Sequence, residues 1–152
     1  LMTRVARKVA AEFPEILFQE ANIDAMCMWL LKNPDNYDVI VTSNMFGDIL
    51  SDLCAQLVGG LGFASSGNIG DRYAVFEPTH GSAPKYAGQY KVNPMAMLLT
   101  VRLMLDWLNE SAMARKLEEA IAAVLREGKA RTYDMGGTNT TLEVAEAVAR
   151  KF

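Results

Sequence analysis

The chain has 152 residues, of which 51% are hydrophobic, so it can bury the core of about one globular domain. Its net charge is only −3 and its lysines and arginines are scattered, which argues against a surface for nucleic acid or for an anionic membrane. No apolar run is long enough to span a bilayer. Cys27 and Cys54 lie among apolar neighbours without metal-ligand spacing, which predicts buried, reduced thiols and an intracellular, cytoplasmic location.

The N-terminal part begins with a helical pattern followed by a short apolar run. Val5, Val9 and Phe13 recur at helical spacing, which predicts a helix that ends at Pro14. The run EILFQE, residues 15–20, suits a β-strand. Because the first residues resemble the middle of a helix without a cap, we expect the chain to begin inside a larger protein.

A second helix and a second apolar run follow. Helical spacing predicts a helix over about residues 23–32, which Asn33-Pro34 stops. The β-branched run YDVIVTS, residues 37–43, is typical of a strand buried on both faces, and a helical pattern that contains Asp48 and Asp52 follows it at once. A strand that leads directly into a helix indicates the α/β class.

The central segment, residues 59–94, differs in composition from the rest of the chain. Gly59-Gly60 closes the preceding helix, and the many glycines and prolines leave room for only one short strand, near residues 73–76. Long irregular segments within a compact domain are usually functional. Three helices are predicted after it: the first starts at Asn93-Pro94, the second spans about 111–127, and the third opens on the capping box Thr140-x-x-Glu143.

Asp48 and Asp52 are four residues apart, which places both carboxylates on one face of a helix. Their repulsion there costs about a few tenths of a kcal/mol. Spacing alone favours an ordinary solvated helix face, and the alternative is that the pair provides two oxygen ligands of a divalent cation such as Mg²⁺ or Mn²⁺. Because a helix entered from a buried strand starts at the carboxyl edge of the sheet, the position favours a ligand site. Asp24 is the candidate third ligand.

The central segment also contains the sole histidine, His80, in EPTHGSAPKYAGQYKVNP. Gly81 and Gly88 permit close backbone approach, and Lys85 and Tyr86 add a cation and a ring. The segment ends at a predicted helix N-terminus, which favours negative charge. The pattern suits a loop that binds a phosphorylated nucleotide and also a purely structural loop. It does not decide between them, because no GxGxxG or P-loop motif is present.

GxSxG and HExxH motifs are absent as well. Trp29, Trp107 and the methionines at 95–104 fall at helical spacing and predict core packing.

Two long, ordered motifs identify a family. The stretch NMFGDILSDLCAQLVGGLGFASSGNIG, followed by FEPTHGSAPKYAGQYKVNP, resembles the isocitrate/isopropylmalate dehydrogenases, which are metal-dependent β-decarboxylating enzymes. The resemblance extends to NIDAMCMWLLKNPDNYDVIVTSN before them and to TYDMGGTNTTLEVAEAV after them. It implies an α/β fold of that family's own type, not a Rossmann fold, of which this chain is the C-terminal part. Residues 1–58 would belong to the small, dimerising domain and residues 59–152 to the large domain.

The resemblance also implies roles for particular residues. Asp48 and Asp52 would bind Mg²⁺ or Mn²⁺ together with the substrate, and Asp24 would complete the site across a homodimer interface. The adenosine half of a nicotinamide cofactor would lie on the loop that contains His80, Gly81, Ser82, Ala83, Pro84, Lys85 and Tyr86, with Asn93 and Tyr133. The family's catalytic Tyr and Lys lie outside this segment, so the resemblance predicts no catalytic side chain here and an inactive fragment.

The cofactor and the substrate are predicted from the same motifs. Lys85-Tyr86 stands where NAD-using relatives tend to have an acidic and an aliphatic residue, which favours NADP with its extra 2′-phosphate over NAD. Tyr133 resembles a further phosphate contact, whereas Gly137 replaces the arginine of bacterial NADP-dependent members. We therefore expect an NADP-dependent oxidation and decarboxylation of isocitrate to 2-oxoglutarate. The alternatives are a NAD-dependent 3-isopropylmalate dehydrogenase, a related 2-hydroxy acid dehydrogenase, or a non-catalytic regulatory subunit.

Overall fold

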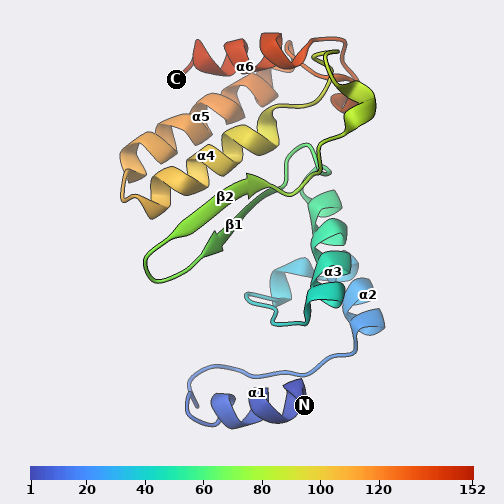
Figure 1. Ribbon diagram of the computed structural model, residues 1–152, viewed down its shortest axis with the longest axis vertical. Coiled ribbons are helices and arrows are strands. Elements are labelled where there is room, and N and C mark those ends of the chain that lie inside the picture. Colours follow the sequence, from blue (N-terminus) through green and yellow to red (C-terminus); the bar gives the residue numbers. More distant parts are fainter. The chain divides into compact units, whose positions relative to one another are not determined.

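The computed structural model describes residues 1–152 as helices joined by loops, with a single β-hairpin (Figure 1). In chain order the α-helices are α1 (Met2–Ala10), α2 (Ile23–Lys32), α3 (Asn44–Leu57), α4 (Met95–Trp107), α5 (Ser111–Glu127) and α6 (Thr141–Ala149). The strands are β1 (Ser65–Ile69) and β2 (Ala74–Pro78). Short 3₁₀ turns occur at η1 (Pro34–Asn36), η2 (Pro84–Tyr86) and η3 (Tyr133–Met135). None of the helices is both long and apolar enough to cross a bilayer.

The chain divides into two compact units, Leu1–Leu53 and Cys54–Phe152, with the division inside α3. This division lies close to the predicted boundary at residue 58. Assignment of the two parts to a small dimerising domain and a large domain stays a prediction.

The second unit is built around α4. This helix contacts both strands of the hairpin and also α5, and α5 contacts α6 (Figure 1). The strands pair antiparallel, with Gly67 opposite Phe76 and Ile69 opposite Ala74. Exposure alternates along β2, so one of its faces is covered, and Phe76 meets Trp107 of α4 with ring centroids 6.0 Å apart. The hairpin therefore lies on α4 through one apolar face, as the period of two along a strand requires.

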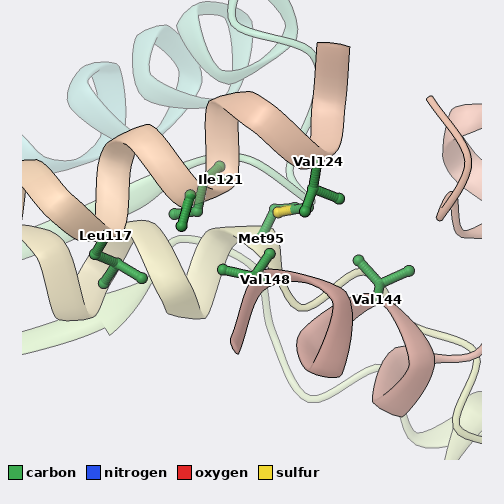
Figure 2. Packing of buried hydrophobic residues seen from close by; sticks show 7 residues of the cluster. Met95, Leu117, Ile121, Val124, Val144 and Val148 are labelled. Carbon is green, nitrogen blue, oxygen red and sulfur yellow. The ribbon is translucent and has the colours of Figure 1, made fainter. Parts of the chain in front are cut away.

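A hydrophobic core joins the three C-terminal helices. Figure 2 shows Met95 of α4 beside Val124 of α5 and Val148 of α6, and Met95 is 0% exposed. Leu117, Ala120, Ile121 and Val144 complete the cluster. Burial of a side chain of this size contributes about 1.5–3 kcal/mol, so this cluster is the main source of stability of the second unit. Arg102 of α4 adds exposed ion pairs to Asp106 and to Glu118 of α5.

The helix predictions are confirmed, and their ends have the expected caps. Asn93 Oδ1 accepts a hydrogen bond from the Met95 N–H at 3.0 Å, where α4 starts. At α6, Thr140 Oγ1 accepts from the Glu143 N–H while the Glu143 carboxylate accepts from the Thr140 N–H, which is the predicted capping box. The helix α5 ends before Gly128, whose φ of 63° is the left-handed conformation that favours glycine.

The predicted strands at residues 15–20 and 37–43 are wrong for this chain, because neither segment is paired with another strand. A strand needs a partner for its backbone hydrogen bonds, and these segments find none. Val39 and Val41 are 83% and 77% exposed, whereas a strand buried on both faces had been expected. The central segment contains two strands instead of one: β2 covers the predicted position, and β1, rich in serine and glycine, had no recognisable strand pattern.

Two expectations about burial also need correction. Trp29 is 46% exposed, and both Cys27 and Cys54 are unpaired but only half-buried, so these apolar side chains do not enter a closed core. The first unit has few buried residues, and the helix faces that contain these side chains are only partly covered. Trp107 and Met97 are also partly exposed, whereas Met95 is buried as predicted.

Candidate functional site

The first candidate site comprises the aspartates of the first unit. Asp48 and Asp52 lie within α3 one turn apart and are both exposed, so their carboxylates share a face of the helix as the spacing predicts. Asn44 Nδ2 donates to Asp48 Oδ2 at 3.1 Å, which holds one carboxylate oxygen in place. Asp52 takes part in no ion pair or side-chain hydrogen bond.

Asp24 lies in the first turn of α2 and is also exposed. Its Oδ1 accepts the N–H of the next residue, Ala25, at 2.7 Å, and its other oxygen has no partner in the chain. No three acidic, histidine or cysteine side chains come together as a metal-binding group. The structure thus places each predicted ligand on a helix surface, while the joint site of Asp24, Asp48 and Asp52 stays a prediction.

The donor set of these three residues fits a hard divalent cation. Each carboxylate keeps at least one oxygen without a partner in the chain, and oxygen ligands are those that Mg²⁺ and Mn²⁺ prefer. Gly47 precedes Asp48 in the same turn, where a Cβ would lie 3.3 Å from Thr42 Cγ2. The close approach of Thr42 shows that the segment entering α3 packs against its first turn.

The second candidate site lies on the loops between β2 and α6 in the second unit. Tyr86 and Tyr133 come from the separate 3₁₀ turns η2 and η3, yet their ring centroids are 5.7 Å apart. Lys85 Nζ lies 4.8 Å from the centroid of the Tyr86 ring. Lys91 Nζ lies 5.1 Å from the Tyr86 centroid and 4.8 Å from that of Tyr133. We call Lys85, Tyr86, Lys91 and Tyr133 the basic–aromatic cluster.

The two tyrosines of this cluster differ in acidity. The interaction with the Tyr133 hydroxyl, and after it the one with Lys85, lowers the pKa of Tyr86. The same interaction with Tyr86 raises the pKa of Tyr133. The lowered pKa of Tyr86 and the raised pKa of Tyr133 make the Tyr86 hydroxyl the more acidic of the two.

The loop that contains Lys85 and Tyr86 is open at Gly81 and Gly88. No heavy atom of a neighbouring residue lies within 4 Å of the position that a Cβ on Gly81 or Gly88 would take. His80 is half-buried with Nδ1 2.9 Å from the Gly81 carbonyl, and a carbonyl only accepts, so Nδ1 carries the proton. Ala83 has a φ of 43°, a left-handed conformation that is costly for a residue with a Cβ.

Asn93 has a structural role that limits its side chain. It is buried, its Oδ1 caps α4, and its Nδ2 donates to Asp134 Oδ2 at 2.9 Å. Thr132 Oγ1 donates to the other Asp134 oxygen at 2.5 Å. The hydrogen bond from Asn93 to Asp134 thereby ties η3 to the start of α4. Ala96 N–H donates to the Gly62 carbonyl at 2.8 Å. Two N–H groups of the first turn of α4 therefore have partners within the chain, which leaves fewer donors there for the anion that the sequence led us to expect.

Sequence reasoning missed Lys91 and Asp134. Lys91 lies two residues before Asn93 in the quoted motif, but a lysine in a loop gives no signal of its orientation. Asp134 follows Tyr133 directly and was not assigned a role. Only the fold shows that Lys91 lies beside the ring of Tyr133 and that Asp134 accepts a hydrogen bond from Asn93.

Comparison with known proteins identifies the family. A sequence model described as isocitrate/isopropylmalate dehydrogenase matches residues 1–148. The chain belongs to the isocitrate/isopropylmalate dehydrogenase family. It is 50% identical over 149 residues to a 3-isopropylmalate dehydrogenase of Archaeoglobus fulgidus, a match that covers 98% of this chain and 45% of that protein. It is also 49% identical over 140 residues to a probable isocitrate dehydrogenase [NAD] subunit alpha, mitochondrial, of Caenorhabditis elegans. That match covers 92% of this chain and 39% of that protein.

Solved structures of this family share the fold. A crystal structure of isocitrate dehydrogenase from Methylococcus capsulatus matches with a TM-score of 0.91 and 40% identity, and the match covers 98% of this chain and 44% of that one. The predicted family and its fold class are therefore confirmed. The chain spans less than half the length of the relatives described above.

Proposed function

We propose that this chain is the C-terminal portion of an NADP-dependent dehydrogenase that oxidises isocitrate and releases CO₂ to give 2-oxoglutarate. Membership of the family supports an oxidative decarboxylation of a 2-hydroxy acid. NADP is proposed over NAD because of the basic–aromatic cluster, which brings Lys85, Tyr86 and Tyr133 together on the surface of the second unit. The names of the relatives include both isopropylmalate and NAD-dependent isocitrate enzymes, so substrate and cofactor require a direct test.

In this proposal the residues of the first unit hold the metal. Asp48 and Asp52 would present carboxylate oxygens from one face of α3, and Asp24 of a second copy would complete the set in a homodimer. A bound Mg²⁺ or Mn²⁺ supplies Lewis-acid polarisation of the substrate's C2 oxygen and stabilises the negative charge that develops when CO₂ leaves. The helix fixes the two carboxylates relative to each other, which a mobile loop would not do.

The residues of the second unit would hold the adenosine half of the cofactor. The open backbone at Gly81 and Gly88 lets a ligand approach the loop closely. Tyr86 would offer its hydroxyl to a phosphate oxygen, and the Lys85 ammonium beside its ring adds positive charge. The remaining residues predicted for this site are His80, Ser82, Ala83, Pro84, Asn93 and Tyr133.

The metal role is tested in the full-length enzyme that contains this chain. Asp48→Asn keeps the shape of the side chain but removes its charge, so we expect Mn²⁺-dependent turnover of isocitrate to fall by at least about 100-fold. Asp35→Asn, an exposed aspartate of η1 in the same unit, is the matched control and should keep its activity. Full activity of Asp48→Asn would contradict the metal role.

The same enzyme settles substrate and cofactor. We expect a higher kcat/KM with isocitrate than with 3-isopropylmalate, and a higher one with NADP than with NAD. Preference for 3-isopropylmalate with NAD would replace the proposal by its first alternative. Absence of turnover on either acid, with Mn²⁺ binding retained, would favour a related 2-hydroxy acid as substrate. Absence of both turnover and Mn²⁺ binding would favour a regulatory subunit.

A further inference from the structure

Lys91 stands beside both rings of the basic–aromatic cluster. Its Nζ is 5.1 Å from the centroid of Tyr86 and 4.8 Å from that of Tyr133, while Lys85 Nζ is 4.8 Å from the Tyr86 centroid. Two ammonium groups therefore lie around one tyrosine ring, within about 10 Å of each other, which is about one Debye length at 0.1 M ionic strength. They repel each other unless an anion lies near both.

Neither ammonium forms an ion pair within the chain. The ion pairs of the structure involve Arg7, Arg102, Arg150 and Lys151, and none involves Lys85 or Lys91. The acidic residue next to Tyr133 in sequence is Asp134, and its two oxygens accept hydrogen bonds from Asn93 and Thr132. The cluster thus has two cations that form no ion pair, with the Asp134 carboxylate as the nearby negative charge that, after the interaction with Tyr86, raises the pKa of Tyr133.

The backbone on each side of Lys91 is fixed by the start of α6. Thr141 N–H donates to the Tyr90 carbonyl at 2.7 Å, and Thr141 Oγ1 donates to the Val92 carbonyl at 2.5 Å. Tyr90 has a φ of 48°, so the chain turns sharply just before Lys91. These two hydrogen bonds, both from Thr141, hold the backbone on each side of Lys91, whose Nζ lies 4.8 Å from the centroid of Tyr133 in η3. A backbone held in advance loses less entropy when a ligand binds.

Gly137 cannot supply a cation at this site. A Cβ on Gly137 would lie 2.1 Å from the Arg131 carbonyl oxygen and 2.4 Å from Arg131 Cβ. Its N–H also donates to the Thr132 carbonyl at 2.9 Å, which closes the turn around η3. Any side chain at this position would force the turn open, so a basic residue has to come from elsewhere in the fold.

We propose that Lys91, together with Lys85, reads the 2′-phosphate of NADP, with the Tyr86 and Tyr133 hydroxyls as the neutral hydrogen-bonding groups of the same site. This inference rests on the proposed function. A phosphate monoester has about two negative charges at pH 7, and the two ammonium groups balance them. Lys91 is then a specificity-determining residue that separates NADP from NAD.

The test measures the dissociation constants of NADP and NAD by calorimetry, with the full-length enzyme that contains this chain. Lys91→Gln should weaken NADP binding about fivefold, the effect of one exposed charge pair, and should leave NAD binding nearly unchanged. Lys91→Arg keeps the charge and should retain most of the preference for NADP. The preference in the wild-type enzyme should decrease with added salt, because the cluster is exposed to solvent.

Lys116→Gln is the matched control. Lys116 is another lysine beside an aromatic ring, with its Nζ 4.9 Å from the centroid of Phe152, and it lies on α5 outside the cofactor loops. Its removal should leave the ratio of the two dissociation constants unchanged. Melting temperatures of all variants show whether any loss of binding reflects unfolding, in which case Lys91→Arg and the salt dependence decide.

The outcomes separate this inference from the proposed function. If Lys91→Gln keeps the wild-type preference for NADP over NAD and Lys85→Gln reduces it, the role of Lys91 is overturned and the NADP assignment stays intact. Equal binding of NADP and NAD by the wild-type enzyme would overturn both. Equal losses of NADP and NAD in Lys91→Gln would show that Lys91 supports the loop without reading the phosphate, which also overturns the inference.

Discussion

Gly137 illustrates how the absence of a side chain shapes the candidate cofactor site. Its α-carbon lies against the backbone of Arg131, where an added Cβ would come within 2.1 Å of a carbonyl oxygen. Gly137→Ala should therefore lower the free energy of unfolding of the second unit by about 1–3 kcal/mol, the usual cost of overpacking a tight site. Denaturant titration followed by circular dichroism measures this loss.

Gly81→Ala is the control for this prediction. The Cβ position at Gly81 has no neighbouring heavy atom within 4 Å, so the added methyl group meets no steric obstacle. Its unfolding midpoint should stay close to that of the wild type. Equal midpoints for Gly81→Ala and Gly137→Ala would show that the turn around Arg131 relaxes without cost.

At the level of single residues, local spacing predicted which side chains share a helix face, but it did not predict contacts between distant segments. Four-residue spacing placed Asp48 and Asp52 on one helix face, because the helix period is fixed by local geometry. The approach of Tyr133 to Tyr86, and the place of Lys91 beside both rings, depend on how α4, α5 and α6 pack. Contacts between residues far apart in sequence have no local pattern, so they could be seen only in the fold.

The capping box of α6 makes a helix end sensitive to pH. The Glu143 carboxylate accepts from the Thr140 N–H at 2.7 Å and from the Thr140 hydroxyl, and these hydrogen bonds lower the pKa of Glu143. A carboxyl group with a lowered folded pKa stabilises the fold above its unfolded pKa of about 4.3, and this contribution is lost as the pH falls through the folded pKa. The stabilising effect is therefore present at neutral pH and absent in strong acid.

Two variants at this helix end test the effect. Thr140→Ala removes the hydroxyl cap and should cost about 1 kcal/mol of stability at neutral pH. Glu143→Gln removes the charge, so its melting temperature should lie below that of the wild type at neutral pH and converge with it as the pH falls through the lowered pKa of Glu143. A gap that persists unchanged in acid would mean that the charge of Glu143 does not stabilise α6.

At the level of elements, helices were predictable and isolated strands were not. Local spacing and the Thr140 and Asn93 caps were sufficient for α4 and α6, because a helix satisfies its backbone hydrogen bonds within its own segment. The runs 15–20 and 37–43 have strand-like composition, but a strand forms only where a second strand meets it. For β1 and β2 the partner is the neighbouring segment of the chain. The pairing makes a strand of SSGNI, which has no recognisable strand pattern of its own.

Across the whole molecule the apolar burial is uneven. The buried cluster that includes Met95, Ile121 and Val144 lies in the second unit, whereas Leu30 and Leu50 are the buried apolar residues of the first. Large side chains of the first unit are exposed instead, among them Leu17, Ile16, Leu31, Met45, Val39 and Val41. Exposed apolar surface of this extent usually marks an interaction surface.

We therefore expect the 152-residue chain of 16.7 kDa to self-associate when it is purified alone. Removal of apolar surface from water contributes about 25 cal/mol per Å², so contacts among several exposed valines and leucines outweigh the weak repulsion from a net charge of −3. Size-exclusion chromatography with light scattering should give a mass that rises with protein concentration.

The double variant Val39→Asp, Val41→Asp should shift this mass toward the monomer. Val75→Asp, at an exposed hairpin position of the second unit, should shift it less. A sharp monomer peak for the wild-type chain at all concentrations would contradict this expectation, because it would mean that the exposed apolar residues of the first unit do not drive association.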